Sequence, residues 1–390
     1  MKYQKKLIWS AVAATAFATG SLAQAASMED RVKNLEEQMN ATTHAMESRS
    51  GGHGSGAGNT HIGGYGEMNY NNTHTDTPAG TATQRQIDMR RLVLFVGHDF
   101  TDAIRMYSEL ELEHSFFENG EGNGEIEVEQ AYIEMDLNDH HRLKTGLFLV
   151  PVGILNETHE PDTFYGVERN PIETHIIPTT WWEGGVGLSG EIAPGWGYDV
   201  ALTSGLNTAR LGSPGNIREA RQKLSKADAN DYAVTGRIKF TGIPGTELAA
   251  TAQNQSDIDQ GASAEAVGAT LVELHAVYNQ GPFGLRALYA QWSLDGAVAA
   301  AAGNDKQDGF YIEPSYRIND QWGVFARYNQ WDNSPNAVVD TQQEQIDVGA
   351  NYWPHENVVF KADYADYSMG TSPANTERYA INLGVGWSFH

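Results

Sequence analysis

The chain has no cysteine among its 390 residues, which excludes a disulfide framework, a cysteine nucleophile and a thiolate metal site. It also lacks a continuous apolar run of the roughly 18 residues that a transmembrane helix needs. Basic residues are scarce as well, because 26 Lys and Arg stand against 50 Asp and Glu, a net charge of −24. Nucleic-acid binding depends on basic groups that neutralise phosphates, so we expect no nucleic-acid partner.

The amino terminus has the three parts of a secretory signal peptide. Lys2, Lys5 and Lys6 form a basic start, residues 7–18 are largely apolar, and Ala23-Gln-Ala25 offers a small-residue cleavage site. We therefore expect residues 1–25 to be a cleaved signal peptide, and the loss of its three lysines takes the net charge to −27. An exported chain that has no membrane helix is either a soluble secreted protein or a β-barrel of the bacterial outer membrane.

A short heptad pattern follows in residues 26–49. Alternating steps of four and three residues separate Met28, Val32, Leu35, Met39, Thr42 and Met46, as in the a/d seam of a coiled coil. Fewer than three heptads are marginal alone, so this segment is either an amphipathic spacer with frayed ends or a periplasmic coiled-coil helix that helps to register a homotrimer. Residues 50–60 are rich in glycine and predict a flexible linker.

From residue 61 to residue 390 one unit repeats: roughly ten to thirteen residues of alternating character, then a turn. We count sixteen such segments, near 61–71, 86–98, 103–115, 125–138, 140–150, 184–194, 195–205, 230–241, 244–255, 268–280, 281–293, 308–318, 319–331, 343–354, 355–368 and 377–389. Seven short connections rich in turn-forming residues alternate strictly with eight long ones, the first of them near 72–85. This pattern predicts an all-β, 16-stranded antiparallel transmembrane β-barrel with both ends in the periplasm.

The last predicted strand shows two distinct faces. Tyr379, Ile381, Leu383, Val385, Trp387 and Phe389 fall on one face, and Ala380, Asn382, Gly384, Gly386 and Ser388 on the other. A lipid-facing side and a water-facing side are typical of the closing strand of an outer-membrane barrel. We expect this strand to pair with the first one, and we expect outer-membrane lipid and lipopolysaccharide to surround the barrel.

Charged side chains in these strands belong in the water-filled interior, because a charge on the lipid face near the midplane costs a few kcal/mol. The alternation predicts basic pore-lining residues at Arg90, Arg105, Arg142, Lys144, Arg237, Arg286, Arg317, Arg327 and Lys361, and acidic ones at Glu109, Glu111, Glu134, Glu313, Asp347 and Asp363. Arg90 and Arg91 are neighbours that cannot both face inward without a β-bulge. We expect Arg90 to be the inward one.

The longest connection, residues 151–183, joins the fifth and sixth predicted strands. It contains four prolines and two tryptophans, too much rigid and apolar material for a solvated flap, and loops of this length are usually functional or disordered. We expect this third extracellular loop to fold into the barrel and narrow it. Its constriction candidates are Glu157, Glu160, Asp162, Arg169 and Glu173.

Residues 148–153, 157–169 and 181–188 together resemble the segment around the constriction loop of the porin O and P family, often labelled phosphate-selective porins. The resemblance extends from residue 61 to the carboxyl end and is strongest over 125–205. It implies a sixteen-stranded homotrimeric barrel, with the third loop folded inward, that passes small solutes by diffusion. Some members of the family select anions through a ladder of arginines and a ring of lysines.

The charges of this chain indicate a different selectivity. At the inward positions acidic residues are at least as numerous as basic ones, and an acidic pore concentrates cations and hinders anions. If Arg90, Arg105, Arg142 and Lys144 lie opposite the acidic loop, the two groups create a transverse field that favours polar, dipolar solutes.

Three functions remain open. The first is an outer-membrane porin for passive diffusion of small hydrophilic solutes or ions. The second is a substrate-specific channel for phosphate, another anion or a small organic solute, and the third is a structural or adhesive barrel. An open sixteen-strand lumen favours the first two.

We do not expect an enzyme, because the chain has neither a Gly-x-Ser-x-Gly elbow nor a His-Glu-x-x-His motif. Scattered histidines, such as His159 and His275, are expected at the surface, and we expect no metal or other cofactor.

Overall fold

The computed structural model describes residues 60–115, 124–209, 217–370 and 376–389. The expected signal peptide, the heptad segment and the linker up to residue 59 lie outside these ranges, so they stay predictions. Within the described ranges, no helix has the length and apolarity needed to cross a membrane.

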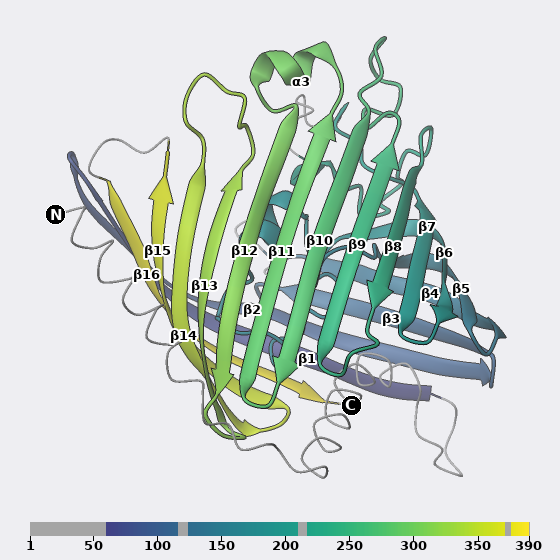
Figure 1. Cartoon of the computed structure of the whole chain (residues 1–390), viewed down its shortest axis with the longest axis horizontal. Helices are drawn as coiled ribbons and strands as arrows, with labels where there is room; N and C mark the ends of the chain where they lie inside the picture. Colours follow the sequence, from purple (N-terminus) through teal and green to yellow (C-terminus); the bar gives the residue numbers. More distant parts are fainter. Residues whose placement is uncertain (1–59, 116–123, 210–216, 371–375, 390) are drawn as a thin grey trace.

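Sixteen antiparallel strands form a closed barrel in which each strand pairs with its neighbours in the chain (Figure 1). They are β1 (Thr60–Thr77), β2 (Gly80–Thr101), β3 (Ile104–Glu113), β4 (Ile126–Asn138), β5 (His141–Leu149), β6 (Trp182–Ala193), β7 (Trp196–Thr203), β8 (Ala233–Phe240), β9 (Thr246–Gln255), β10 (Ala269–Gln280), β11 (Phe283–Leu294), β12 (Lys306–Arg317), β13 (Trp322–Asp332), β14 (Gln343–His355), β15 (Val358–Met369) and β16 (Glu377–Phe389). β1 and β16 close the barrel, with Gly64 opposite Phe389. The predicted sixteen-strand barrel and its closing pair are confirmed.

Apart from the tight turn between β1 and β2, short and long connections lie at opposite ends of the barrel. In Figure 1 the turn between β12 and β13 is at the lower end, and α3 (Ala297–Ala302) is at the upper end among the longer connections. One predicted loop is wrong: residues 72–85 belong mostly to β1 and β2, whose ladder continues until Thr77 faces Gly80. This stretch is rich in β-branched threonine, which favours strands, but it has no apolar face from which alternation could be read.

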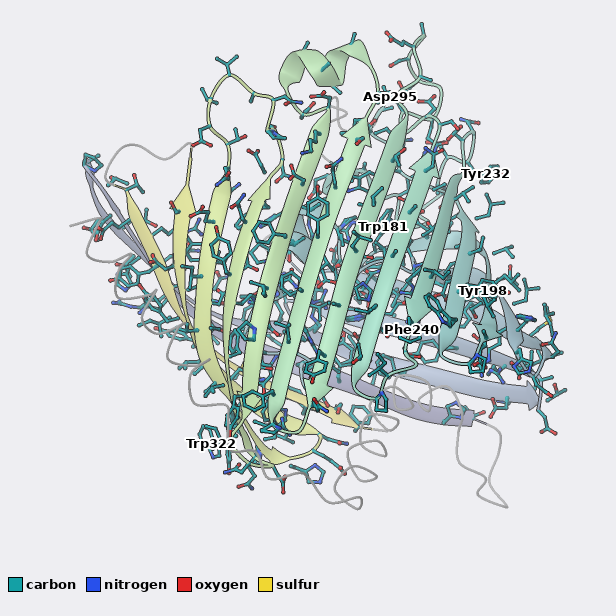
Figure 2. All side chains as sticks on the ribbon, viewed as in Figure 1. Trp181, Tyr198, Tyr232, Phe240, Asp295 and Trp322 are labelled. Carbon is teal, nitrogen blue, oxygen red and sulfur yellow. The ribbon has the colours of Figure 1, made fainter. Side chains whose placement is uncertain are left out.

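Along the strands an exposed apolar face alternates with a buried polar one. In β3, Leu110 is 44% exposed, whereas its neighbours Glu109 and Glu111 are each 1% exposed. Figure 2 shows Trp322 and Phe240 near the short-turn end and Tyr232 nearer the other end, as in the aromatic girdles of membrane barrels. An apolar exterior and a polar interior are what a barrel in lipid requires.

Register shifts occur in several strand pairs, and two of them, in β2 and β4, lie beside buried charged residues. In β2, Arg91 faces Glu67 and Met89 faces Met68, which leaves Arg90 between two register positions. In β4, Gln130 faces Glu109 and Val128 faces Leu110, so Glu129 is the additional residue. Because a bulge inserts a residue and re-aims its side chain, consecutive polar residues can both reach the buried face. Glu129 and Gln130 are both buried there.

The connection between β5 and β6, residues 150–181 (hereafter the β5–β6 loop), contributes an apolar core of its own. It contains the short π-helix η1 (Ile172–Ile176). Ile172, Ile176, Ile177 and Trp181 are almost fully buried and belong to one cluster with Leu271, Leu288, Trp292, Tyr311 and Trp331 of β10–β13. Burial of each large apolar side chain contributes about 1.5–3 kcal/mol, so this core fastens the loop to the buried faces of four strands. Trp181 lies between the two ends of the barrel in Figure 2.

Candidate functional site: the β5–β6 loop and the charges on the barrel wall

The first half of the β5–β6 loop meets several separate strands. The carboxylate of Glu157 pairs with Arg237 of β8 at 2.6 Å, and the hydroxyl of Ser388 in β16 donates to Asp162 at 2.8 Å. Further along, Arg286 of β11 donates to the carbonyl of Thr163 at 2.7 Å. These three strands are not neighbours in the barrel, so the loop contacts separate parts of the wall.

The second half of the loop continues around the wall. The backbone N–H of Val167 donates to Asp363 of β15 at 2.6 Å. Glu168 accepts hydrogen bonds from Asn69 and Asn71 of β1 at 3.2 and 3.1 Å. Of the predicted constriction residues, Glu157 and Asp162 thus contact the wall directly. Arg169 instead donates to Thr180 within the loop at 2.9 Å.

Glu173, also predicted to line the constriction, has a different position. Its side chain is fully buried and accepts hydrogen bonds from the backbone N–H groups of Ile154 and Leu155 at 2.7 and 2.6 Å. Asn170 and Tyr311 donate to its second oxygen at 2.8 and 3.2 Å. Glu173 therefore braces the loop from within and joins it to β12, a role that the acidic composition of the loop did not reveal.

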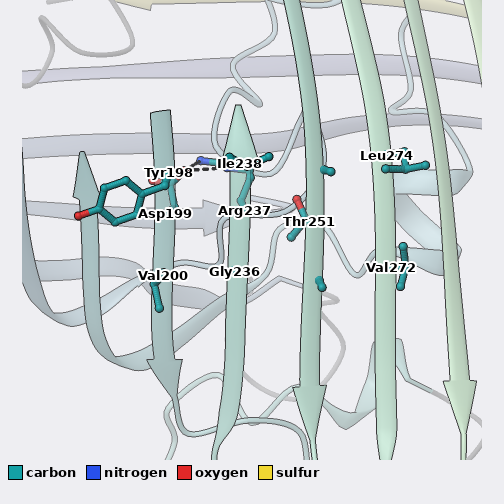
Figure 3. Close-up of a pocket in the computed structure, with 11 residues that line it drawn as sticks. Tyr198, Asp199, Val200, Gly236, Arg237, Ile238, Thr251, Val272 and Leu274 are labelled. Carbon is teal, nitrogen blue, oxygen red and sulfur yellow. Dashed lines mark hydrogen bonds and ion pairs between the residues drawn. The ribbon is translucent and has the colours of Figure 1, made fainter. Parts of the chain in front are cut away.

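Three buried arginines on the wall are each held between two carboxylates. Arg91 contacts Glu67 at 2.8 Å and Glu111 at 3.2 Å. Arg237 contacts Glu157 at 2.6 Å and Asp199 at 2.8 Å, and Figure 3 shows the link between Asp199 and Arg237 on adjacent strands. Arg327 contacts Glu313 at 3.0 Å and Asp347 at 2.9 Å. We call these groups the arginine triads; each has two formal negative charges and one positive charge.

Arg91 was not expected at the buried face. The bulge in β2 allows both arginines to form ion pairs. Arg90 lies 3.7 Å from both Asp88 and Glu168. Arg91 is the more buried of the two, at 5% exposed. The choice of Arg90 alone was therefore incomplete, since a single strand's alternation cannot reveal a bulge.

The other early basic residues have contacts on the wall. Arg105 pairs with Glu134 at 2.9 Å and with Asp136, and Arg142 pairs with Asp136 at 3.3 Å. Lys144 lies over the ring of Phe148 at 4.8 Å. Arg105 and Arg142 thus pair with acidic residues of the intervening strand β4, and the field expected between a basic wall group and the acidic loop stays a prediction.

A small hollow of about 120 Å³ lies between the loop and β10–β14. It is lined by Asp162, Thr163, Phe164 and Tyr165 of the loop and by Asn279, Leu285, Arg286, Ser315, Arg317 and Trp353 of the wall. The guanidinium of Arg317 stacks over Trp353 at 3.9 Å. Nearby, the amine of Lys361 lies 3.5 Å from the ring centre of Phe164. The hollow therefore combines charges of both signs with aromatic rings.

His159 and His275 are buried, in contrast to the surface positions expected for them. His159 of the loop lies between Glu109 of β3 and Glu129 of β4, with its Nε2 atom 3.6 and 3.5 Å from their carboxylates. Burial alone would lower the pKa of His159, but the two carboxylates outweigh burial and raise this pKa to about 10. His275 lies between Glu273 and Glu247 on the wall, at 2.7 and 3.0 Å.

The end of the β5–β6 loop is held by two arginines from the connection between β7 and β8. Arg218 of the 3₁₀-helix η3 (Arg218–Ala220) donates to the carbonyls of Thr174 and Thr179 at 2.8 and 3.1 Å. Arg221 donates to the carbonyl of Pro178 at 3.3 Å and to that of Thr180. Burial, together with the nearby Arg221, lowers the pKa of Arg218 to about 10. Sequence alone could not pair these two connections.

A second hollow, of about 370 Å³, lies on the outer face over β7–β10. Gly236, Ala250 and Ala252 form its floor, and the exposed side chains of Val200, Ile238, Val272 and Leu274 surround it (Figure 3). Such a surface carries no chemistry of its own and suits contact with lipid chains.

Comparisons with known proteins agree with this architecture. Residues 62–380 match the family model described as phosphate-selective porin O and P. An uncharacterized protein of Aquifex aeolicus is 30% identical over 331 residues, which cover 78% of this chain and 74% of that protein.

Among solved structures, an anion-selective porin from Comamonas acidovorans is similar with a TM-score of 0.60 at 12% identity, covering 85% of this chain and 100% of that one. OmpT of Vibrio cholerae, in a trimer form, gives a TM-score of 0.54 at 11% identity, covering 84% and 99%. At these identities the two structures support the barrel fold alone. With most of its barrel matched by one family model, the chain belongs to the phosphate-selective porin O and P family and is an outer-membrane channel for passive diffusion.

Proposed function

We propose that this porin passes small hydrophilic solutes and ions with a preference for cations over phosphate and other anions. The arginine triads carry this proposal. A phosphate site needs guanidinium or ammonium groups whose donors are available to the ligand, whereas each of these three guanidiniums already contacts two carboxylates. A wall with excess negative charge attracts cations and raises the barrier to anions.

We infer further that the β5–β6 loop is folded into the lumen and sets the narrowest part of the pore. Contacts with strands as far apart as β8 and β15 support this position, since Glu157 pairs with Arg237 and Val167 donates to Asp363. The apolar cluster with β10–β13 supports it as well. A loop attached on several sides cannot move freely, so it would act as a fixed filter.

A second candidate function is favoured by the 120 Å³ hollow beside the loop. Arg286 and Arg317 both line it, and the guanidinium of Arg317 stacks on the ring of Trp353. Two guanidiniums and aromatic rings could hold a small anion or organic acid, which would make the protein a substrate-specific channel. Asp162 lines the same hollow, so the more general diffusion of polar solutes is the function we favour.

The assembly that we propose is a homotrimer with its short turns in the periplasm, exported with the help of the signal peptide at 1–25. The heptad pattern in residues 26–49 supports a stalk that registers three chains. OmpT of Vibrio cholerae, which has a similar barrel fold, has a trimer form, and this is consistent with the proposed homotrimer.

Selectivity can be measured by recording the purified protein in planar bilayers across a gradient of potassium chloride. We expect a reversal potential of the sign given by potassium preference, and we expect millimolar phosphate to leave the chloride-salt current unreduced. Glu168→Gln removes a carboxylate that is 35% exposed on the loop and should shift the reversal potential toward the anion side. Glu191→Gln removes the same charge near the short-turn end of β6, where the carboxylate is 49% exposed, and serves as the control. An anion preference of the wild type would refute the proposal, and block by phosphate would favour the substrate-specific channel.

A further inference from the structure

We propose that Glu109, Glu129 and His159 bind a divalent transition-metal ion of the Zn²⁺ class, which fastens the β5–β6 loop to β3 and β4. The three residues come from three separate elements, and each offers one ligand atom within 4.8 Å of the other two. All three side chains are at most 3% exposed. One imidazole and two carboxylates form a ligand set that suits Zn²⁺ and neighbouring metals.

The distances fit metal ligands better than hydrogen-bond partners. The Nε2 atom of His159 lies 3.6 Å from Oε1 of Glu109 and 3.5 Å from Oε2 of Glu129, beyond the usual length of a hydrogen bond. Two ligands placed about 2.05 Å from a tetrahedral zinc ion are separated by about 3.4 Å. The observed separations are close to that value, so an ion fits between the three atoms with little movement.

The ligand atoms also have no other hydrogen-bond partner within the described residues. This holds for Oε1 of Glu109, both carboxylate oxygens of Glu129 and Nε2 of His159. Buried polar atoms are nearly always satisfied, so a group of unpaired ones close to each other indicates a binding site. The buried Glu111 places a further carboxyl group beside Glu129.

Neighbouring groups hold the ligands in the orientation that a metal needs. The second ring nitrogen of His159, Nδ1, lies 3.3 Å from the carbonyl of Asn156, so Nδ1–H has its own acceptor and a bound ion would replace only the proton on Nε2. Gln130 donates to Oε2 of Glu109 at 2.6 Å, which leaves Oε1 for the ion. Such outer contacts are typical of metal sites.

His275 is a matched control within the same barrel. It also lies between two carboxylates, but both ring nitrogens are within hydrogen-bond distance of them, Glu273 at 2.7 Å and Glu247 at 3.0 Å. A histidine whose two nitrogens are both engaged has no atom to offer a metal. The two sites therefore share composition and differ in the geometry on which the proposal rests.

The test uses the full-length protein folded in detergent, stripped with EDTA and titrated with Zn²⁺ by calorimetry, with the metal content measured by mass spectrometry. We expect about one tightly bound Zn²⁺ per chain and a higher melting temperature with the ion. Glu129→Gln and His159→Gln should each weaken binding by at least about 100-fold, whereas His275→Gln should leave it unchanged. Glu129→Gln retains the shape of the site, so it still tests the proposal if His159→Gln fails to fold.

Absence of saturable Zn²⁺ binding to the wild type would overturn the proposal, as would equal binding by Glu129→Gln. Tight binding of Ca²⁺ in preference to Zn²⁺ would overturn the assignment to the transition-metal class. Any effect of the metal on conduction rests on the proposed function, whereas binding does not. Stoichiometric Zn²⁺ binding without a change in channel current would therefore support the metal site and count against the loop as the pore's narrowest part.

Discussion

Replacing Glu173 with alanine tests whether the β5–β6 loop is held by one buried carboxylate. The change removes the acceptor for the N–H groups of Ile154 and Leu155, at 2.7 and 2.6 Å, and the contact with Tyr311 of β12 at 3.2 Å. Leaving a buried donor without an acceptor costs about 1–3 kcal/mol. Two orphaned N–H groups therefore cost about 2–6 kcal/mol in the docked state of the loop.

A loss of about 3 kcal/mol increases the undocked fraction of the loop roughly 100-fold. Other contacts of the loop remain, including the pair of Glu157 with Arg237, so we expect partial release and not a loss of the barrel. Single-channel recordings should show larger mean conductance and more current noise than the wild type. Glu173→Gln keeps one oxygen for the two N–H groups and should have a smaller effect.

The reasoning would be refuted by Glu173→Ala traces that match the wild type in conductance and noise. Folding of both variants is checked independently by the mobility difference between heated and unheated samples in detergent gels. A variant that keeps this difference while its current changes has lost the docking of the loop and retained the barrel.

Two other predictions concern stability and assembly. Arg327→Leu leaves Glu313 and Asp347 buried without their shared partner, and breaking such a group costs about 3–5 kcal/mol, so the urea midpoint of the folded barrel should fall clearly. Arg142→Leu, at an arginine that is 45% exposed and pairs with Asp136 at 3.3 Å, should cost at most about 1 kcal/mol. Equal midpoints for the two variants would contradict the importance of burial. Deletion of residues 28–49 should weaken the trimer in native gels if the heptad segment registers it, and a trimer of undiminished stability would show that this segment is dispensable.

The strands were predictable because each one carries its own signal. In β16 the alternation of Ile381, Asn382 and Leu383 coincides with exposed and buried positions, and no partner strand is needed to read it. The extension of β1 and β2 was missed because Thr-rich and Asn-rich segments lack the apolar half of the pattern. Strand formation there depends on the mutual pairing of two segments, with Thr77 opposite Gly80.

The site was less predictable because its contacts join distant elements. The alternation within each strand predicted that Glu134 and Arg105 both face the interior of the barrel. Only the register between β3 and β4 shows that they are direct partners. Glu129 reaches the buried face only because β4 has a bulge. His159 meets Glu109 and Glu129 only because the loop contacts β3 and β4. Acidic residues in a loop therefore indicated a charged site without showing that Glu173 is a brace and Glu157 a partner of Arg237.

The pairing of β1 with β16 has a consequence for the order of events during synthesis and insertion. Asn71 and Asn382, which are 311 positions apart, share a hydrogen bond of 2.9 Å across this closing pair. The contact cannot form until the last strand has been made, and closing so long a chain segment is slow. A chain that ends before β16 leaves two unpaired strand edges, which lipid does not tolerate. Closure thus distinguishes complete chains from truncated ones, because only a complete chain can seal the channel and leave no open edge in the bilayer.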